Sequence, residues 1–483
     1  MIVRGGYLPG LDVRDVEWRE LVFNQRHDRF AVQVPLLTPA QMQRLANTVA
    51  KARRRHLMQL PVADIVSIID AAIAMLLDRN NAYRQRAEAL LPRVSGFDQE
   101  MVRLALGSYL RTFRKAELLR FVHEDFPNPG ILDGLQPAVK GGLVQAHGPD
   151  VLTHVWAGNV PALSLWSFVC GLLVKAGNIG KLASAEPLFA GWFAELIAEV
   201  EPKLKDAFAV VWWPNDQAAV GDALFGASNV VLAYGGNETL AAIGKRIPIT
   251  TRYLPYGHKL SFAMVGSETL TQDKAWSLAH AAAADVMRYD QHGCYSPQVI
   301  YVERGGLVTP RELARMLAHE LENFERKHPR RALTLAQSRD VASWRNHQEM
   351  SALSDENREL IESSTGTWTV VYCEGALEFA PSGLNRTVRI QAIDRLDDIA
   401  ECVHPYHRVL QTAGLAANPE RVTDLAAQLG AAGVTRICAI GAMTEPEAGW
   451  HHDGRFNLLD LVTLSEVEDS AYRQAERYAP YAE

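Results

Sequence analysis

Short apolar runs alternate with longer amphipathic stretches through the middle of the chain. The apolar runs predict strands at residues 151–155, 178–182, 207–212 and 229–234. Apolar residues at helical spacing predict helices at residues 162–175, 187–201, 217–225 and 238–245. Strands that alternate with helices imply a parallel sheet with right-handed crossovers. Nucleotides bind at the carboxyl edge of such a sheet.

A second block with the same alternation follows. Its strands are predicted at residues 261–265, 299–302, 367–373, 384–393, 434–440 and 458–464. Its helices are predicted at residues 274–288 and 416–429, and a third begins at Thr309, which precedes a proline. Two such blocks predict an α/β protein with two doubly wound parallel sheets.

The first 160 residues follow other patterns. Residues 1–36 alternate in the manner of strands or extended arms, and Thr38 with Pro39 predicts the start of a helix. An all-helical region then extends to about Glu124, with a break near residues 92–96 and no evident chemistry. Apolar runs at 143–146 and 151–155 predict a paired hairpin, which is either buried or directed toward a partner subunit.

Composition narrows the class of protein. The chain has 483 residues, enough for two or three domains. Its net charge of −7 argues against a nucleic-acid binder, because phosphates need a basic surface. No apolar run is long enough to span a membrane, and no signal peptide precedes the first domain. Five widely spaced cysteines without a C-x-x-C pair favour a reduced, cytoplasmic protein with no structural zinc.

The strongest candidate for chemistry is Cys294, in the sequence Asp-Gln-His-Gly-Cys-Tyr-Ser-Pro at residues 290–297. It lies in a loop between a predicted helix and a predicted strand, where a thiol can be exposed for nucleophilic attack. Its thiolate would be the reactive form, so the site must lower the thiol pKa or supply a base. Taken alone, a cysteine is more often a small buried residue.

Three further candidates lie at predicted strand ends. Asn159 precedes Pro161 and can either point its amide at an oxyanion or cap the following helix. Lys181 ends the next strand and can bind a ribose or phosphate, or simply face solvent. Gly235, Gly236 and Asn237 form a turn into a helix, whose backbone N–H groups favour an anion.

The order of these motifs resembles the aldehyde dehydrogenase superfamily. More narrowly, the chain is similar to the long-chain acyl-CoA reductases of the bacterial luminescence (LuxC) type. The similarity lies in the strings at residues 158–161, 177–187, 386–389 and 450–458. It implies a catalytic Cys294, an oxyanion contact from Asn159, and cofactor contacts from Lys181, Ser184, Gly235, Gly236 and Asn237. His451 and His452 belong to the last string but receive no role.

Two departures from hydrolytic aldehyde dehydrogenases matter. The family's water-activating glutamate falls on Pro255, which favours an acyl-enzyme that survives to be reduced. The glutamate that often contacts the ribose diol falls on Ser184, which together with Lys181 favours NADPH over NADH.

The resemblance implies NADPH-dependent reduction of a long-chain acyl thioester such as acyl-CoA, through an acyl-Cys294 intermediate. Two alternatives stay open: a hydrolytic aldehyde dehydrogenase, and an acyl-carrying subunit that works with an acyl-protein synthetase or acyltransferase. We expect a cofactor-binding region at residues 1–255, a Cys294-bearing domain at 256–440 and an oligomerisation segment at 441–483, in a homodimer or homotetramer. The acyl chain length and donor are not predicted.

Overall fold

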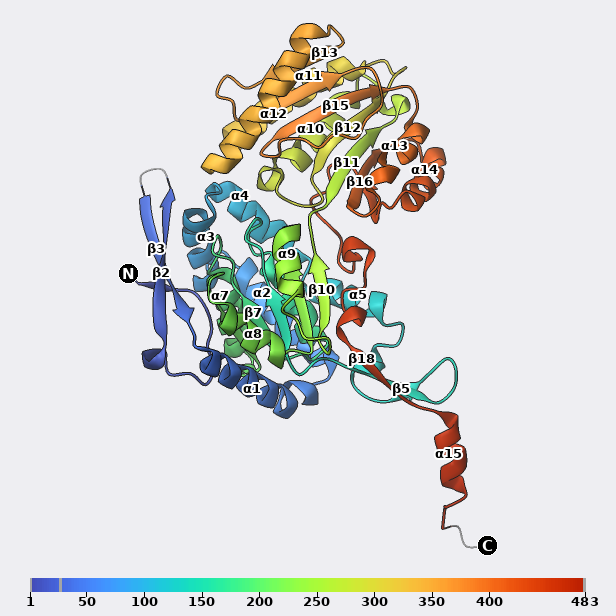
Figure 1. Ribbon diagram of the computed structural model, residues 1–483. Helices are drawn as coiled ribbons and strands as arrows, with labels where there is room; N and C mark the ends of the chain where they lie inside the picture. The colour runs from blue at the N-terminus through green and yellow to red at the C-terminus, as the bar shows by residue number, and fades with distance from the viewer. Residues whose placement is uncertain (1, 26–27, 481–483) are drawn as a thin grey trace.

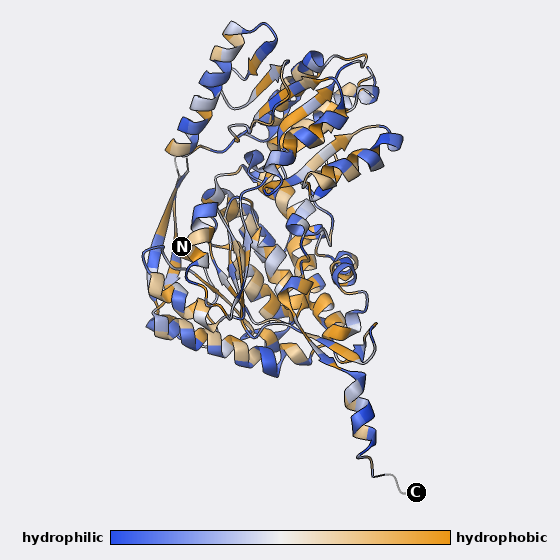
Figure 2. Cartoon of the chain, turned by 45° about the vertical axis from the view of Figure 1, so that its right-hand side comes forward, coloured by the Kyte–Doolittle hydropathy of each residue, from blue (hydrophilic) through white to orange (hydrophobic). Residues whose placement is uncertain are grey.

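Two parallel β-sheets, one above the other in Figure 1, organise the chain. The computed structural model describes residues 2–25 and 28–480. The lower sheet has five strands and the upper sheet has seven. A C-terminal extension with α15 (Asp469–Glu476) projects from the lower part. Figure 2 shows that hydrophobic residues concentrate in the strands and in the helices packed on them.

The five-stranded sheet has the order β10-β9-β6-β7-β8 and is parallel throughout. Its strands are β6 (Leu152–Val155), β7 (Asn178–Lys181), β8 (Phe208–Val211), β9 (Val230–Tyr234) and β10 (Arg252–Tyr256). Residues of α1 (Pro39–Arg55), α8 (Ala218–Ala227) and α9 (Asn237–Gly244) form one core with the sheet. Residues of α2 (Val62–Leu77), α6 (Ser164–Leu173) and α7 (Phe189–Val200) form the other. The predicted alternation of strands and helices is therefore confirmed.

The N-terminal region supplies a small sheet and helices that pack on both faces of the five-stranded sheet. Strands β1 (Val3–Arg4), β2 (Glu17–Gln25) and β3 (Asp28–Leu36) pair in the order β1-β3-β2. Thr38 caps α1 through a reciprocal bond with Gln41, as its sequence predicts. The helical region continues through α3 (Ala82–Ser95), α4 (Gln99–Leu104), a π-helical turn (Ala105–Tyr109) and α5 (Lys115–Asp125). Gly96, with φ of 77°, ends α3 at the predicted break.

The seven-stranded sheet has the order β13-β14-β15-β12-β11-β16-β17, and only β13 runs antiparallel. Its strands are β11 (Leu260–Val265), β12 (Pro297–Glu303), β13 (Arg358–Glu362), β14 (Thr369–Cys373), β15 (Thr387–Ile393), β16 (Leu410–Ala416) and β17 (Arg436–Ala439). Helices α10 (Ala275–Met287) and α11 (Pro310–Lys327) pack on one face. Helices α13 (Ile399–Val403) and α14 (Pro419–Ala431) pack on the other. α12 (Leu335–Ser354) lies beside β13.

The predicted hairpin between residues 143 and 155 is wrong. β5 (Leu143–His147) pairs instead with β4 (Gln136–Pro137) and with the late strand β18 (Thr463–Val467). β6 lies between β7 and β9 in the five-stranded sheet. The run at 148–150 carries the chain from one sheet to the other, so neighbouring strands in the sequence have different partners. The predicted strand at 458–464 begins only at Thr463, after a 3₁₀ turn at Leu459–Leu461.

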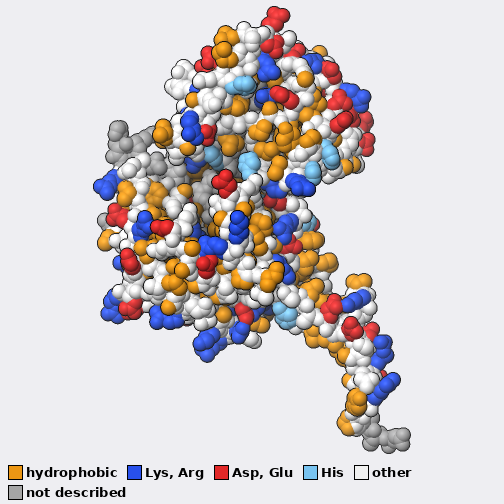
Figure 3. Space-filling model, viewed as in Figure 1, with side chains coloured by type: hydrophobic (Ala, Val, Ile, Leu, Met, Phe, Trp, Pro, Cys, Tyr) orange, Lys and Arg blue, Asp and Glu red, His pale blue; other side chains and the backbone are white. Residues whose placement is uncertain are grey.

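Three strands of the five-stranded and seven-stranded sheets were not predicted. β10 contains Pro255, which is tolerated because β10 lies at the edge of its sheet. β13 and β16 also lack a prediction. Among the described residues, no single helix has the length and hydropathy to cross a membrane. Within the described part of the chain, the segments 39–59 and 62–77 reach that length and hydropathy only when they are taken together, and the chain bends by 108° at the break between them. Figure 3 shows charged side chains of both signs interspersed over one face of the molecule.

Candidate active site

The loop that carries Cys294 lies between α10 and β12 and has an unusual backbone. Tyr289, Asp290 and Gln291 have φ values of 53°, 52° and 66°, in the left-handed region that side chains disfavour. A second loop has the same feature, because Leu384, Asn385 and Arg386 have φ values of 53°, 54° and 71°. Such conformations cost about 1–3 kcal/mol each and persist only where the surroundings impose them.

The two loops impose these conformations on each other. The Gln291 side-chain amide donates to the carbonyls of Pro297 (2.7 Å) and Thr387 (2.8 Å). Its oxygen accepts from the backbone N–H groups of Arg386 (3.2 Å) and Thr387 (3.1 Å). A buried ion pair of 2.7 Å joins Arg386 to Asp290. The string at residues 386–389 therefore has a physical role, since it holds the loop that presents the thiol.

Contacts with neighbouring side chains fix the position of Cys294 and shift the pKa of its thiol. Its carbonyl accepts a hydrogen bond from the Ser261 hydroxyl (2.7 Å), at the start of β11. Burial raises the pKa of the Cys294 thiol to about 11, and the negative charge of Asp453 adds to the rise. A hydrogen bond from Gln411 and the charge of Lys259 act in the opposite direction. In this state the thiol is protonated at neutral pH, so its attack on a carbonyl carbon requires a base.

Asn159 reaches the same loop from the other sheet. It follows β6, and its side-chain Nδ2 donates to the backbone carbonyl of His292 at 2.8 Å. A primary amide carries two N–H donors, so one remains available for another acceptor. Its Oδ1 is buried and has no partner. The contact fixes the amide beside the thiol loop, although 133 residues separate the two positions in the sequence.

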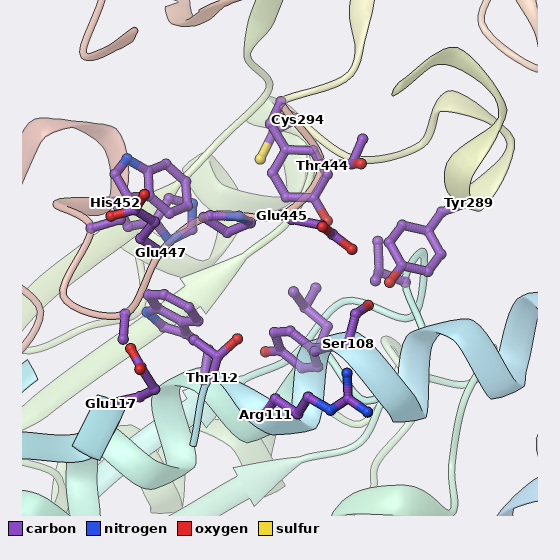
Figure 4. A pocket seen from close by; sticks show the side chains of 18 of the residues that line it. Ser108, Arg111, Thr112, Glu117, Tyr289, Cys294, Thr444, Glu445, Glu447 and His452 are labelled. Carbon is purple, nitrogen blue, oxygen red and sulfur yellow. The ribbon is translucent and has the colours of Figure 1, made fainter. Parts of the chain in front are cut away.

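Cys294 lines two cavities. The helix-side cavity, of about 360 Å³, is bounded by Ser108, Tyr109, Thr112, Trp166 and Trp450 among others. The sheet-edge cavity, of about 340 Å³, is bounded by Asn159, Gly235, Gly236, Lys259 and Gln411 among others. The residues common to both are Val160, Leu163, Tyr234, Cys294, Tyr295 and His452. Figure 4 shows the Cys294 sulfur pointing into the helix-side cavity, with Ser108 and Thr112 on the opposite wall.

The glycine turn faces the sheet-edge cavity. Gly235 and Gly236 follow β9 and lead into α9, whose first residue is Asn237. The Asn237 side-chain oxygen accepts from the backbone N–H of His258, a long contact of 3.4 Å. The first N–H groups of a helix have no intrahelical acceptor, and they favour a negatively charged group. This end of the cavity can therefore hold a phosphate.

Lys181 and Ser184 lie farther along the same sheet edge and outside the lining of both cavities. Lys181 pairs in register with Val155, and its Nζ lies 5.2 Å from the Trp213 ring centre. Burial lowers the pKa of Lys181 to about 8. The Ser184 hydroxyl accepts a hydrogen bond of 3.1 Å from the Trp212 indole. These side chains can thus contact a ligand that extends along the edge, beyond the cavity that holds the thiol.

Comparison with known families matches residues 57–464 to the family described as acyl-CoA reductase (LuxC). The chain belongs to the LuxC family. A long-chain acyl-protein thioester reductase of Vibrio harveyi is 24% identical over 313 residues, 64% of this chain and 62% of the relative. A second such reductase, from Photobacterium leiognathi, is 25% identical over 391 residues, 78% of this chain and 76% of the relative.

Solved structures of aldehyde dehydrogenases have the same fold as this chain. The aldehyde dehydrogenase KauB from Pseudomonas aeruginosa superposes with a TM-score of 0.75 at 13% identity, covering 97% of this chain and 96% of that one. Aldehyde dehydrogenase 21 from Physcomitrella patens gives a TM-score of 0.71 at 13% identity, covering 97% and 98%. The predicted aldehyde dehydrogenase fold is confirmed. With the family, it identifies an oxidoreductase of acyl thioesters.

Two contributors to this site are not predicted from the sequence. The helical region, expected to carry no chemistry, provides a wall of the helix-side cavity through Ser108 and Tyr109 of the π-helical turn. π-Helical turns occur often at functional sites, but their hydrogen bonding leaves no clear sequence signal. The C-terminal string provides His452 and Asp453. Asp453 is the one carboxylate among the described residues that line the sheet-edge cavity.

Proposed function

We propose that this protein reduces a long-chain acyl thioester to the aldehyde with NADPH, through an acyl-Cys294 intermediate. The observation that carries the proposal is the position of Cys294 at the junction of the two cavities. The sheet-edge cavity has the glycine turn and helix start that suit a nucleotide phosphate. The helix-side cavity has many aromatic and aliphatic lining residues, which suit an alkyl chain, alongside the charged Arg111, Glu117, Arg120, Glu445 and Glu447.

The Cys294 sulfur attacks the acyl carbonyl carbon, and the donor leaves as a thiol. The second N–H of Asn159 and the backbone N–H of Cys294 are the donors for the oxyanion, and the His292 carbonyl keeps the Asn159 amide in place. NADPH, when bound, supplies the two electrons and one hydrogen that convert the acyl group to the aldehyde oxidation level. Tyr234 and Leu163 border both cavities and exclude water from the thioester carbon.

The residues along the sheet edge fit NADPH. Gly235 and Gly236 leave the backbone open, since a methyl group added at Gly236 would meet no atom within 4 Å. Lys181 offers a cation for a 2′-phosphate, and Ser184 places no negative charge beside it. An adjacent carboxylate would instead repel that phosphate.

The hydrolytic alternative needs a base directed at water. The glutamate position of aldehyde dehydrogenases is Pro255 here, within the exposed edge strand β10. Asp453 lies in the sheet-edge cavity, but its Oδ1 accepts from Gln411 at 2.6 Å and its Oδ2 lies 3.7 Å from the Lys259 ammonium. Both carboxylate oxygens of Asp453 are thus already engaged by protein side chains rather than directed at a water. We therefore favour reduction over hydrolysis.

The named relatives act on acyl-protein thioesters, so the acyl donor of this chain is proposed to be a thioester on CoA or on a partner such as an acyl-protein synthetase or acyltransferase. If the donor is acyl-CoA, the protein needs no partner for acylation. If the donor is an acylated protein, it needs that partner. An acyl-carrying subunit without reduction would use Cys294 but not the sheet-edge cavity.

We also propose that residues 441–483 mediate a homodimer or homotetramer, while residues 1–255 and 256–440 form the cofactor-binding and Cys294-bearing domains. β18 is exposed over Thr463–Glu466, and α15 has no buried residue. An exposed antiparallel sheet of this kind pairs readily with a second chain. Light scattering on the protein and on a form ending at residue 462 would report the change in oligomeric state.

The decisive experiment is intact-mass spectrometry after addition of a long-chain acyl-CoA, without and then with NADPH. We expect one acyl adduct on Cys294 that is released as aldehyde when NADPH is added. Cys294→Ala should abolish the adduct, whereas Cys402→Ser, at another partly exposed cysteine, should not. An adduct that NADPH leaves untouched would identify an acyl carrier instead. Release as free acid would identify a hydrolase.

A further inference from the structure

The C-terminal segment returns from the seven-stranded sheet to the thiol and brings a histidine that the steps above do not use. After β17, the backbone N–H of Met443 donates to the buried carboxylate of Asp285 on α10 (3.1 Å), which fixes the start of the segment. At its far end, Leu458 and Leu459 donate to Asp125 at the end of α5. Between these anchors, His452 lines both cavities that meet at Cys294.

Three aromatic rings hold the His452 imidazole in place. Its ring centre lies 4.7 Å from Tyr256, 4.8 Å from Trp450 and 5.9 Å from Tyr234. The imidazole is thus fixed at the border of the cavities. In Figure 4 the Cys294 sulfur points toward the side of the cavity on which His452 lies.

The neighbouring Asp453 is oriented by an unfavourable backbone. Its φ of 55° lies in the left-handed region, where most side chains are strained. In this conformation its carboxylate reaches Gln411 at 2.6 Å and Lys259 at 3.7 Å, and its Oδ1 lies 3.9 Å from His452 Nε2. The carboxylate is therefore placed to stabilise an imidazolium next to it.

The same charges act on the thiol and on the imidazole. Asp453 and Lys259 shift the pKa of Cys294, and they also shift the pKa of His452. Burial lowers the pKa of His452, so its imidazole is neutral at pH 7 and able to accept a proton. Asp453, Lys259, Tyr234 and Tyr256 are the charged and titratable groups next to it, and Glu445 and Glu447 line the same helix-side cavity.

We propose that His452 is the base that takes the proton of the Cys294 thiol, and the acid that returns it to the departing donor sulfur. The inference rests on the proposed acylation of Cys294. In the first half-reaction the thiol proton moves to the imidazole, the Cys294 Sγ–carbon bond forms, and the donor sulfur–carbon bond breaks. The imidazolium then protonates the donor thiolate, so no net proton is exchanged.

The reductive half-reaction requires one proton besides the hydrogen that NADPH supplies. His452 takes this proton from solvent and delivers it to the Cys294 sulfur as the aldehyde leaves. The Asp453 carboxylate stabilises the imidazolium in both halves. His452 thereby supplies the base that the Cys294 thiol needs, since its raised pKa leaves it protonated at neutral pH.

The test measures the rate of Cys294 acylation by a long-chain acyl-CoA in single turnover, without NADPH, in the wild type and three variants. His452→Asn and His452→Phe should each acylate about 100-fold more slowly at pH 7, the range expected for loss of a general base. Added imidazole should restore part of the rate in His452→Asn. His451→Gln is the matched control, because His451 contacts Phe456 and Glu124 and lines neither cavity.

The pH profile of the wild type keeps the test decisive if the variants fail to fold. With His452 as base, the acylation rate should level off by pH 7. Without a base, it should rise about tenfold per pH unit toward the thiol pKa of about 11. That rise, or a rate in the folded His452 variants within threefold of wild type, would overturn the proposal. If the wild type itself is not acylated, the proposed function fails instead.

Discussion

Arg386 and Asp290 form a fully buried ion pair of 2.7 Å between the two loops that shape the thiol site. Their side chains are 1% and 0% exposed, and Arg386 also pairs with Glu325. Removing one member of such a pair leaves an uncompensated buried charge. The pair therefore links the stability of this part of the chain to the position of Cys294.

Arg386→Met should lower the free energy of unfolding by about 3–5 kcal/mol, because the carboxylates of Asp290 and Glu325 lose the guanidinium that contacts both. Denaturant unfolding of the variant and the wild type would measure the change. Arg304→Met is a suitable control, since Arg304 pairs with the largely exposed Asp394, and it should cost about 0–1 kcal/mol. Equal effects of the two substitutions would show that the buried pair contributes nothing specific.

Asn159→Ala should reduce kcat about 100- to 1000-fold, because it removes a donor to the oxyanion together with the bond to the His292 carbonyl. Single-turnover acylation would report the loss, and fluorescence titration should find NADPH binding nearly unchanged. Acylation within threefold of the wild-type rate would assign Asn159 a purely structural role.

The affinity for NADPH should fall as the pH rises through about 8. Burial lowers the pKa of Lys181 to about 8 in the free protein, so the ammonium that attracts a 2′-phosphate is present below that pH and is lost above it. The Kd for NADPH should rise up to about tenfold per pH unit above pH 8, whereas the Kd for NADH should stay flat. Calorimetric titrations at pH 7, 8 and 9 would measure both. Parallel curves for the two cofactors would contradict a contact between Lys181 and the 2′-phosphate.

Ser184→Glu should lower the preference for NADPH over NADH by about tenfold or more, because a carboxylate beside the 2′-phosphate repels it. The ratio of kcat/KM values for the two cofactors measures the preference. Ser184→Ala separates charge from packing, since it only removes the acceptor of the Trp212 indole, and it should leave the ratio unchanged. If both variants alter the ratio equally, the hydrogen bond rather than the charge is responsible.

Thr112→Trp should shorten the acyl chain that the protein accepts. Thr112 lies on the wall of the helix-side cavity opposite Cys294, and an indole there would occupy the space proposed for the distal part of the chain. Activity with long-chain thioesters should fall at least tenfold, while short-chain thioesters react at the wild-type rate. An equal loss for both would mean that the alkyl chain lies elsewhere.

Local patterns predicted most of the sheet framework. The strands that end near Val155, Lys181 and Tyr234 are short runs that alternate with apolar helices along the chain, and in a parallel sheet their ends must meet at one edge. Cys294 and Asn159 could be selected in the same way, from strand-end motifs and from family resemblance.

What could not be predicted depends on contacts between distant residues. β5 alternates like a hairpin strand, but its partner β18 lies more than 300 residues away in the sequence. The string at residues 450–458 indicates the family but no role for its histidines, because only the folded chain brings His452 and Asp453 back to Cys294. The π-helical turn at Ala105–Tyr109 depends on a pattern of hydrogen bonds that residue types do not specify.

The late position of His452 in the chain has a consequence for biosynthesis. Cys294 leaves the ribosome well before His452, by roughly ten to thirty seconds at ordinary translation rates. During that interval the growing polypeptide carries a thiol without the aromatic rings and carboxylate that the C-terminal segment contributes. With His452 as the proposed base, the thiol therefore acquires its proton acceptor only after the C-terminal segment has been synthesised and has folded back.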